Sequence, residues 1–333
     1  MFLNESRARV AERCLRQFYW FHLHGGHGLR SIRSDDKLIW GSLLHAGLAG
    51  FYSDEPVGQA LRNELQAVFP TWDDLPADEK NKWLEELEWI QKVVGRYGQW
   101  AATQDSFTVL GVEQVGSVEL GDSPHRFVFR LDLLVRTNEG IEVIDHKSTS
   151  SGVDERYLAS WEHSSQLWGY SYGAAKQMGY PISRYGVNII RRVNSAGEEP
   201  DLTKCCPACK NGSKKRLNCG DCKGSGRVGR ALRPADRPFH RETFSFTKAK
   251  EAWFIESRTK IADKIEQHQT RLADGDLSAF PRNPSQCYKC PLTDVCYQPN
   301  LADWRTAWIP EERFLTKGPD YVTMKQMAVE EAL

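Results

Sequence analysis

Two aspartates and one lysine are the residues whose types and spacing most directly suggest chemistry. Asp132 lies within the apolar run FVFRLDLLV, and Asp145 and Lys147 end the run IEVIDHK. A charged side chain inside an apolar strand is costly unless it is paired or bound to metal, and residues two apart on a strand share one face of the sheet. Two carboxylates beside a lysine suit the binding of Mg²⁺ or Mn²⁺ and the hydrolysis of a phosphodiester by an activated water. The alternative is an Asp–Lys pair on the surface of a β-hairpin.

Four further residues could complete such a site. Gln166 and Tyr170 are four positions apart in the run SSQLWGYSYGA, so on a helix they would share one face and could bind a phosphate or the lysine. His45, in the apolar run IWGSLLHAGLAGFY, could supply a nitrogen ligand, and Glu113, in VLGVEQV, is a candidate outer acid on a neighbouring strand. The alternatives are a structural helix face for Gln166 and Tyr170 and a core position for His45.

Positioning these side chains requires strands and helices in one α/β fold. The runs 107–120, 125–136 and 140–147 are rich in β-branched and aromatic residues and are separated by turn sequences. They predict three successive strands in an antiparallel meander. Apolar residues at helical spacing predict helices. The expected helices are 5–22, 40–53, 78–99, 161–178 and 247–273, and further strands are expected at 185–193 and 239–246.

Composition and charge limit the class of protein. The chain has 333 residues, 44 basic and 44 acidic, so its net charge is zero, which taken alone argues against a nucleic-acid binder. Its length suggests about two domains, or one domain with insertions. The longest uncharged stretch, residues 39–53, is too short and too polar to span a bilayer, and the charged N-terminal residues are unlike a signal peptide. We therefore expect a cytoplasmic protein that is not associated with a membrane.

The nine cysteines favour metal binding over disulfides, because their number is odd and the chain shows no export signal. One group has the form CxxC-x9-CxxC, a spacing typical of structural zinc. It also resembles the zinc-binding units of DnaJ-type cysteine-rich domains, a match too short to imply chaperone function. Cys205 is left over and could replace its neighbour as a ligand. The expected zinc ligands are Cys206, Cys209, Cys219 and Cys222.

The segment that carries these zinc cysteines is strongly basic. Residues 204–233 contain nine basic residues and one acid, so they would attract a polyanion although the whole chain is neutral. Such a segment could contact DNA phosphates, through residues such as Lys214, Lys215 and Arg216. The alternative is a solvated basic loop that only closes a zinc ribbon.

The order of the candidate residues, histidine, acid, acid-x-lysine and glutamine-x3-tyrosine, resembles the PD-(D/E)XK nucleases of the RecB branch. That branch includes AddB-type helicase–nuclease domains, Cas4-like proteins and viral exonucleases. The resemblance implies a restriction-endonuclease-like core, in which a mixed central β-sheet is flanked by helices. It also implies that the histidine and both acids bind the metal ion, that the lysine acts on the water, and that the glutamine and tyrosine support the site and the substrate strand. The residues concerned are His45, Asp132, Asp145, Lys147, Gln166 and Tyr170.

One departure from this family concerns the residues before the first acid. The family often has Gly-Arg-Ile-Asp there, whereas this chain has Phe129-Arg130-Leu131-Asp132. The missing glycine removes no ligand, but it could alter how closely the backbone approaches.

The remaining cysteines resemble an iron–sulfur site. Cys287, Cys290 and Cys296 supply three thiolates, one short of a full set, and Cys14 is the natural fourth. Iron–sulfur members of the RecB branch have one cysteine before the histidine motif, in a CPxxFY-like context, and three after the nuclease motifs. The run CLRQFY at Cys14 is similar, although leucine stands in place of the usual proline. The resemblance implies a [4Fe–4S] cluster that joins the two ends of the nuclease, while spacing alone leaves a structural Zn²⁺ open.

These features predict a Mg²⁺- or Mn²⁺-dependent DNA exonuclease that acts on or generates single strands, with structural iron–sulfur and zinc sites. The alternative is a non-catalytic nucleic-acid-binding or assembly subunit on a nuclease-like scaffold. The expected partners are DNA, as single strands or duplex ends, and a recombination or replication protein. The expected organisation is a helical N-terminal region 1–100, a nuclease core 101–199, a zinc-binding insert 200–235, the end of the core with the iron–sulfur cysteines 236–300, and a tail 301–333.

Overall fold

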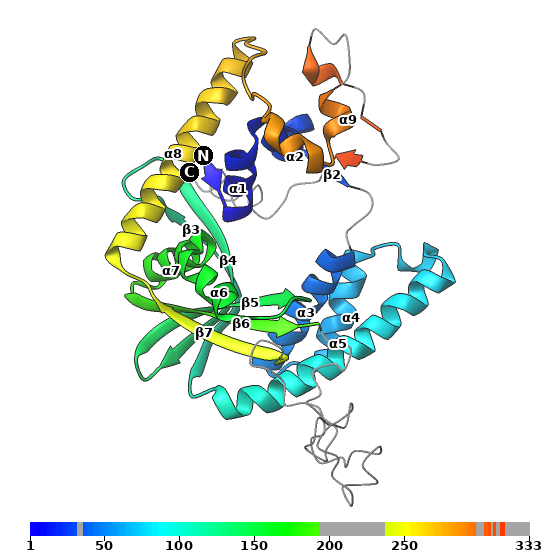
Figure 1. The fold of residues 1–333 in the computed structure, drawn as a ribbon, viewed down its shortest axis with the longest axis vertical. Coiled ribbons are helices and arrows are strands. Elements are labelled where there is room, and N and C mark those ends of the chain that lie inside the picture. Colours follow the sequence, from blue (N-terminus) through cyan, green and yellow to red (C-terminus); the bar gives the residue numbers. More distant parts are fainter. Residues whose placement is uncertain (32–35, 193–236, 298–302, 308, 311–313, 317–333) are drawn as a thin grey trace, which may run out of the picture.

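A six-stranded mixed sheet forms the centre of the described part of the chain (Figure 1). The structure is a computed structural model that describes all residues except 32–35, 193–236, 298–302, 308, 311–313 and 317–333. The antiparallel pairing of the third strand with the fourth, and of the fourth with the fifth, confirms the predicted meander. The fifth and sixth strands run parallel, and the seventh is antiparallel to the sixth. The strands are β1 (Phe2–Leu3), β3 (Thr108–Glu119), β4 (Arg126–Thr137), β5 (Gly140–Thr149), β6 (Ile182–Arg191) and β7 (Phe239–Ser245).

The two edges of β4 are used differently. β3 pairs along one edge for almost its whole length. On the other edge, β1 pairs with Arg126 and Phe127 in parallel, and β5 pairs with residues 133–137 in antiparallel. Residues 128–132 therefore face a gap between β1 and β5, which we call the fork. Asp132 lies at the end of the fork that β5 closes.

Helices cover both faces of the sheet (Figure 1). α7 (Ser165–Met178) and α8 (Lys248–Ala273) pack on one face, in a core that includes Phe127, Val187 and Phe254. α3 (Asp36–Tyr52), α4 (Val57–Val68) and α5 (Ala77–Gln104) cover the other face and pack on Ile190 and Phe239. Burial of each such large apolar side chain contributes roughly 1.5–3 kcal/mol. This arrangement confirms the predicted α/β class, with a mixed sheet between helices.

The helix predicted for residues 5–22 is two helices, α1 (Glu5–Arg13) and α2 (Leu15–His22). Cys14 between them has an extended backbone, with φ −163° and ψ 115°. The break frees the Arg16 amide, which donates to the Pro281 carbonyl at 3.3 Å. The prediction of one helix was wrong because the break depends on a hydrogen bond to Pro281, which is distant in the sequence.

The other elements complete the described chain. α7 begins at Ser165, later than predicted, because the Ser164 hydroxyl caps it by accepting the Leu167 amide at 3.4 Å. Three of the described helices, α4, α6 (Glu155–Ser160) and the short α9 (Thr293–Cys296), were not predicted. Among the described helices, none combines the length and apolar character needed to cross a bilayer.

The remaining elements are a small sheet, a short helix and several 3-10 turns. β2 (Leu29–Ser31) pairs antiparallel with β8 (Phe314–Thr316). The others are α9 (Thr293–Cys296) and 3-10 turns at His24–Gly26, Trp72–Asp74, Trp161–His163, Pro284–Lys289 and Trp304–Thr306.

Candidate active site

The closed end of the fork holds the two acids of the meander. Leu133 and Ile144 form the last pair of β4 with β5, and Asp132 and Asp145 are the next residues on the two strands. The His146 amide donates to Asp132 Oδ2 at 2.7 Å, so a side chain accepts the hydrogen bond where the backbone ladder stops. Both carboxylates are buried, which is costly for charged groups unless other charges compensate them.

His45 and Glu113 complete a compact group of ligand atoms around Asp132. His45 Nδ1, from α3, lies 3.3 Å from Asp132 Oδ2. Glu113 stands opposite Asp132 on β3, and its φ of 48° is a left-handed conformation that costs a non-glycine residue about 1–3 kcal/mol. Ligand atoms of these three residues all lie within 4.8 Å of one another, and no other three His, Cys, Asp or Glu ligand atoms of the described residues come so close together. One nitrogen and two carboxylates at this spacing can hold a single divalent ion.

Asp145 contacts a lysine and a glutamine beside this group. Lys147 Nζ lies 2.5 Å from Asp145 Oδ2. Gln166 Nε2, from α7, donates to Asp145 Oδ1 at 3.5 Å and to the Tyr170 hydroxyl at 2.8 Å, as the i, i+4 spacing predicted. The structure therefore brings all seven candidate residues of the sequence together around the closed end of the fork.

Burial and mutual repulsion perturb the acids of this site. Burial raises the pKa of Asp145 to about 6, Lys147 opposes the rise and Asp132 adds to it. Burial and the nearby Asp132 raise the pKa of Glu113 to about 7. For Asp132, burial alone would raise the pKa, but the neighbouring cationic groups, His45 foremost, outweigh burial and hold the pKa below its usual range. A bound divalent cation would relieve the repulsion among these carboxylates, so the donor set fits such an ion.

Comparison with known proteins agrees with this geometry. The family model of the PD-(D/E)XK nuclease superfamily matches residues 3–297. The chain belongs to this superfamily. Its mixed sheet between helices is accordingly restriction-endonuclease-like, and the divalent metal ions that nucleases of this superfamily use suit the group His45, Glu113 and Asp132. No curated protein matches the chain.

Phe129, which stands where the family often has glycine, packs its ring against two glycines. The Phe129 ring is 2% exposed and lies against Gly116 of β3 and Gly173 of α7. A Cβ atom at Gly116 would come within 2.4 Å of the ring, and one at Gly173 within 2.3 Å. Two glycines on neighbouring elements thus leave room for the Phe129 ring, and Asp132 lies beside His45.

Two cavities flank the acids of the superfamily member. The larger, of about 770 Å³, is lined by His45, Glu113 and Arg130 among others. Arg130 Nε lies 3.2 Å from Glu113 Oε2; the sequence did not single it out, because an arginine near an acid has no spacing of its own. The smaller, of about 510 Å³, lies in the fork between α1 and the pair Gln166 and Tyr170, and we call it the fork cavity.

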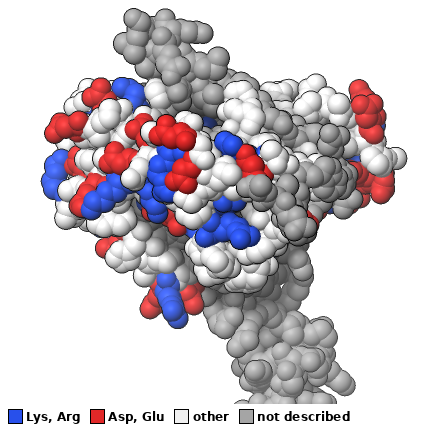
Figure 2. Space-filling view, turned by 90° about the horizontal axis from the view of Figure 1, so that it is seen from above, with Lys and Arg blue, Asp and Glu red and all other residues white. Residues whose placement is uncertain are grey.

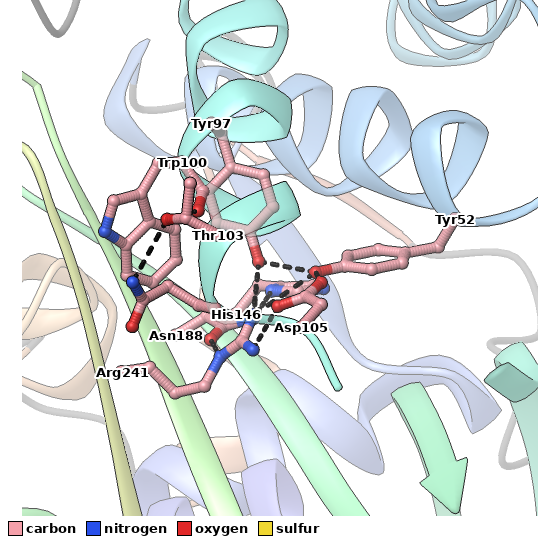
Figure 3. A network of polar contacts seen from close by, with 9 residues as sticks. Tyr52, Tyr97, Trp100, Thr103, Asp105, His146, Asn188 and Arg241 are labelled. Carbon is pink, nitrogen blue, oxygen red and sulfur yellow. Dashed lines mark hydrogen bonds and ion pairs between the residues drawn. The ribbon is translucent and has the colours of Figure 1, made fainter. Parts of the chain in front are cut away.

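Figure 3 shows a buried or partly buried polar network around His146. Because side chains alternate along a strand, this network lies on the face of β5 opposite Asp145 and Lys147. Arg241 Nε donates to Asn188 Oδ1 at 2.5 Å, and Asn188 Nδ2 donates to His146 Nδ1 at 3.2 Å. Burial lowers the pKa of His146 to about 3, so its ring is neutral and can accept that bond. No sequence pattern pointed to these six residues, of which five come from five different elements and Asp105 directly follows α5. We call the set the Arg241 network: Tyr52, Tyr97, Asp105, His146, Asn188 and Arg241.

Cys14, close to the N-terminus, lies near the cysteines between residues 287 and 296. Cys14 Sγ accepts the Asn283 amide at 3.4 Å. Burial raises the pKa of Cys296 to about 11, and the thiols of Cys290 and Cys14 add to the rise. Burial also raises the pKa of Cys290, to which Cys14 and Cys287 contribute. Four thiols whose charged forms repel one another are a donor set that a metal centre would stabilise.

The remaining candidates lie outside the described residues. They are the zinc ligands and their neighbour, Cys205, Cys206, Cys209, Cys219 and Cys222, and the DNA-contact residues Lys214, Lys215 and Arg216. These stay predictions from the sequence.

Proposed function

We propose that this protein is a Mg²⁺- or Mn²⁺-dependent exonuclease that hydrolyses phosphodiester bonds in DNA. The observation that carries the proposal is the group of His45, Glu113 and Asp132, whose ligand atoms lie within 4.8 Å of one another, next to the pair of Asp145 and Lys147, 2.5 Å apart. A site that had lost catalysis would be expected to lose one of these groups. Membership of the nuclease superfamily supports hydrolysis, and the resemblance to viral exonucleases extends it to DNA ends.

Each residue of the site has a task that follows from its contacts. A bound divalent ion would supply charge stabilisation at the phosphate oxygens. His45, Glu113 and Asp132 offer the ligands, and Asp145, at the junction with Lys147, can share in binding. Lys147 orients the attacking water and neutralises negative charge that develops at the phosphate. Gln166 keeps the Asp145 carboxylate in place, with the Tyr170 hydroxyl accepting its second hydrogen bond.

Digestion of end-labelled DNA tests this function. The full chain, purified without oxygen, is incubated with linear single-stranded DNA, linear duplex and a closed circle, each with Mg²⁺ or Mn²⁺. We expect the linear substrates to be shortened from an end, and Asp132→Ala and Lys147→Ala to abolish cleavage while keeping the far-UV circular dichroism of the parent. Full activity in purified Lys147→Ala would contradict the catalytic assignment. Binding of DNA with no cleavage of any substrate would favour the non-catalytic alternative.

We further propose that Cys14, Cys287, Cys290 and Cys296 hold a structural [4Fe–4S] cluster. Asn283 contacts two of these thiols, since its backbone amide donates to Cys14 Sγ at 3.4 Å and its carbonyl accepts from Cys287 Sγ at 3.5 Å. These contacts support one shared site for Cys14 and the later cysteines, and the resemblance to iron–sulfur members of the RecB branch favours a cluster over a single Zn²⁺. Elemental analysis of the anaerobic protein checks this: we expect about four irons per chain, lost in Cys14→Ser, and iron-free protein that holds zinc instead would contradict it.

The basic cysteine-rich segment is proposed to bind one Zn²⁺ and to contact DNA. The CxxC-x9-CxxC spacing and the excess of nine basic residues over one acid support this assignment. The same elemental analysis tests it, since we expect one zinc per chain that survives Cys14→Ser and disappears in Cys209→Ser with Cys222→Ser.

A further inference from the structure

The two cavities beside the acids differ in the sign of their charge. The lining of the larger cavity contains three glutamates and two basic residues, and it includes His45. The lining of the fork cavity contains Arg9 and Arg13 and a single acid, Glu5. The larger cavity is thus the side that suits a cation, and the fork cavity is the side that suits an anion. The charged residues of the larger cavity are Lys37, Glu55, Glu64, Glu113 and Arg130.

The one acid of the fork cavity, Glu5, already has a buried cation beside it. Arg258 of α8, which is 1% exposed, has its Nε 3.2 Å from Glu5 Oε2. The Ser165 hydroxyl donates to Glu5 Oε1 at 2.5 Å. Arg9 Nε lies 3.1 Å from the same oxygen, but its side chain is 53% exposed. Glu5 itself is buried and keeps Arg258 as a second cation, so the exposed Arg9 guanidinium can turn towards another anion without leaving that carboxylate uncompensated.

Arg13 adds a second positive charge on the same side of α1. It lies four residues after Arg9, so the two side chains share one helix face, and both line the fork cavity. Arg13 is exposed, and among the described residues no ion pair joins its guanidinium to a carboxylate. Two guanidinium groups at this spacing can each bind a phosphate, with the bidentate geometry that arginine favours.

The opposite wall of the fork cavity leads to the acids. Gln166 and Tyr170 line it, and Gln166 Nε2 donates to Asp145 at 3.5 Å. Gln166 therefore stands between Asp145 and an anion held by Arg9 and Arg13. Figure 2 shows basic and acidic side chains of the described residues interspersed in that view.

We propose that the fork cavity binds the sugar–phosphate backbone of one nucleic-acid strand through Arg9 and Arg13, beside the bond to be cut. This proposal rests on the proposed function, since it concerns the substrate of the same site. The volume of about 510 Å³ is in the range of small-ligand sites, which admits a short stretch of one strand and not a duplex. The subsite also joins substrate binding to the cysteine site, because Cys14 directly follows α1.

The test is the salt dependence of binding to a labelled oligonucleotide. The full chain carries Asp145→Asn to prevent cleavage, and fluorescence anisotropy measures its affinity for single-stranded DNA at several NaCl concentrations. We expect Arg9→Gln with Arg13→Gln to lower the affinity by about tenfold or more. The slope of log K against log salt should fall by roughly 1.4, at about 0.7 for each phosphate contact of a single strand. Arg9→Lys with Arg13→Lys should keep most of the slope, because the charges remain.

The matched control makes the same charge change on another exposed helix face. Lys260 and Lys264 are also four residues apart, on α8, and both are exposed, so Lys260→Gln with Lys264→Gln should leave affinity and slope unchanged. Arg13→Gln alone, which breaks no ion pair among the described residues, should give about half of the slope change with an unaltered melting temperature. Equal affinity and slope in the variant with Arg9→Gln and Arg13→Gln and in the control with Lys260→Gln and Lys264→Gln would overturn the subsite. If the wild-type chain still cleaves DNA, only the subsite is then wrong; if it neither cleaves nor binds, the proposed function is wrong as well.

Discussion

The two faces of β5 hold polar groups under opposite conditions. On one face, Asp145 is a buried carboxylate whose pKa is raised to about 6 by burial, against the opposing effect of Lys147. On the other face, one residue away, His146 accepts a hydrogen bond from Asn188, whose carbonyl accepts from Arg241 in turn. The alternation of side chains along one strand thus separates a site under electrostatic repulsion from a network whose donors meet acceptors.

This difference indicates which face is functional and which is structural. Repulsion among Asp145, Asp132 and Glu113 lowers the stability of the protein without metal, and such strain persists at sites where binding relieves it. The Arg241 network instead links α3, α5, β5, β6 and β7 behind the site. It also holds His146, whose amide donates to Asp132 at 2.7 Å, so the structural face orients a ligand of the functional face.

The largest effect is expected for Asp145→Asn on the functional face, which should lower activity without lowering stability. Asp145→Asn should reduce cleavage by at least about 10³-fold, which corresponds to about 4 kcal/mol, because it removes a charge beside the metal-binding group. The same change should leave the metal-free protein as stable as the parent at pH 8, or more stable, because it removes a buried carboxylate. Nuclease assays and thermal melts in chelated buffer measure the two effects.

The pH dependence gives the sign of this stability effect. A carboxyl group whose folded pKa is raised, here from 3.8 to about 6, is tolerated when protonated and destabilises the fold once it ionises. The stability advantage of Asp145→Asn should therefore be absent below about pH 4, grow as the pH rises to about 6, and remain constant above it. A variant that melts well below the parent at pH 8 would show that the pair with Lys147 outweighs the cost of burial.

The structural face should respond in the opposite way, with loss of stability. Arg241→Gln leaves Asp105 without its cation, and both side chains are only 15% exposed. Breaking a buried pair by removing one partner costs about 3 kcal/mol, measured as a shift in urea unfolding, while cleavage by the folded fraction should stay within about tenfold of the parent. Arg136→Gln, at an exposed position on β4, is the control and should cost less than about 0.5 kcal/mol. Equal stability of the two variants would contradict the structural role.

Much of the fold could be predicted because its signals are local. The meander follows from alternating apolar residues and turn sequences, and the long helices follow from their spacing. α4 carries Ala60, Leu61 and Leu65 at helical spacing, and all three side chains are buried. The apolar pattern of this helix was therefore present in the sequence although the helix was not predicted. The break at Cys14 and the two-residue strand β1 could not be predicted, since they depend on partners distant in the chain.

The site was predictable where acids and a lysine interrupt apolar strands, and less so where the backbone departs from regular geometry. Glu113 was expected only as an outer acid on a neighbouring strand, yet its ligand atom is in the compact group. A signal existed: the apolar positions Val112 and Val115 are three apart instead of two, which indicates an irregular strand at Glu113. The Arg241 network had no signal, because a tyrosine, an asparagine and an arginine on separate elements meet only in the folded chain.

A divalent ion should sharpen the contrast by stabilising only the functional face. Mn²⁺ that binds the folded state at 100 times its dissociation constant stabilises by about 2.7 kcal/mol, which should raise the melting temperature of the wild-type chain by several degrees. Asp132→Asn should lose most of this rise because it removes the central ligand, whereas Arg241→Gln should keep the rise from a lower starting temperature. An equal rise in all three proteins would place the ion elsewhere.

The smallest effect is expected at the edge of the Arg241 network. The Tyr52 hydroxyl donates to Asp105 Oδ2 at 3.0 Å and lies 2.7 Å from the Tyr97 hydroxyl, while its ring stacks on His146 with an interplanar angle of 11°. Tyr52→Phe keeps the stacking and leaves Asp105 with Arg241, so only about 1 kcal/mol should be lost in urea unfolding. Cleavage at a temperature where both proteins are folded should be unchanged. A tenfold loss of activity without loss of stability would mean that the network acts on the chemistry and does more than hold the strand in place.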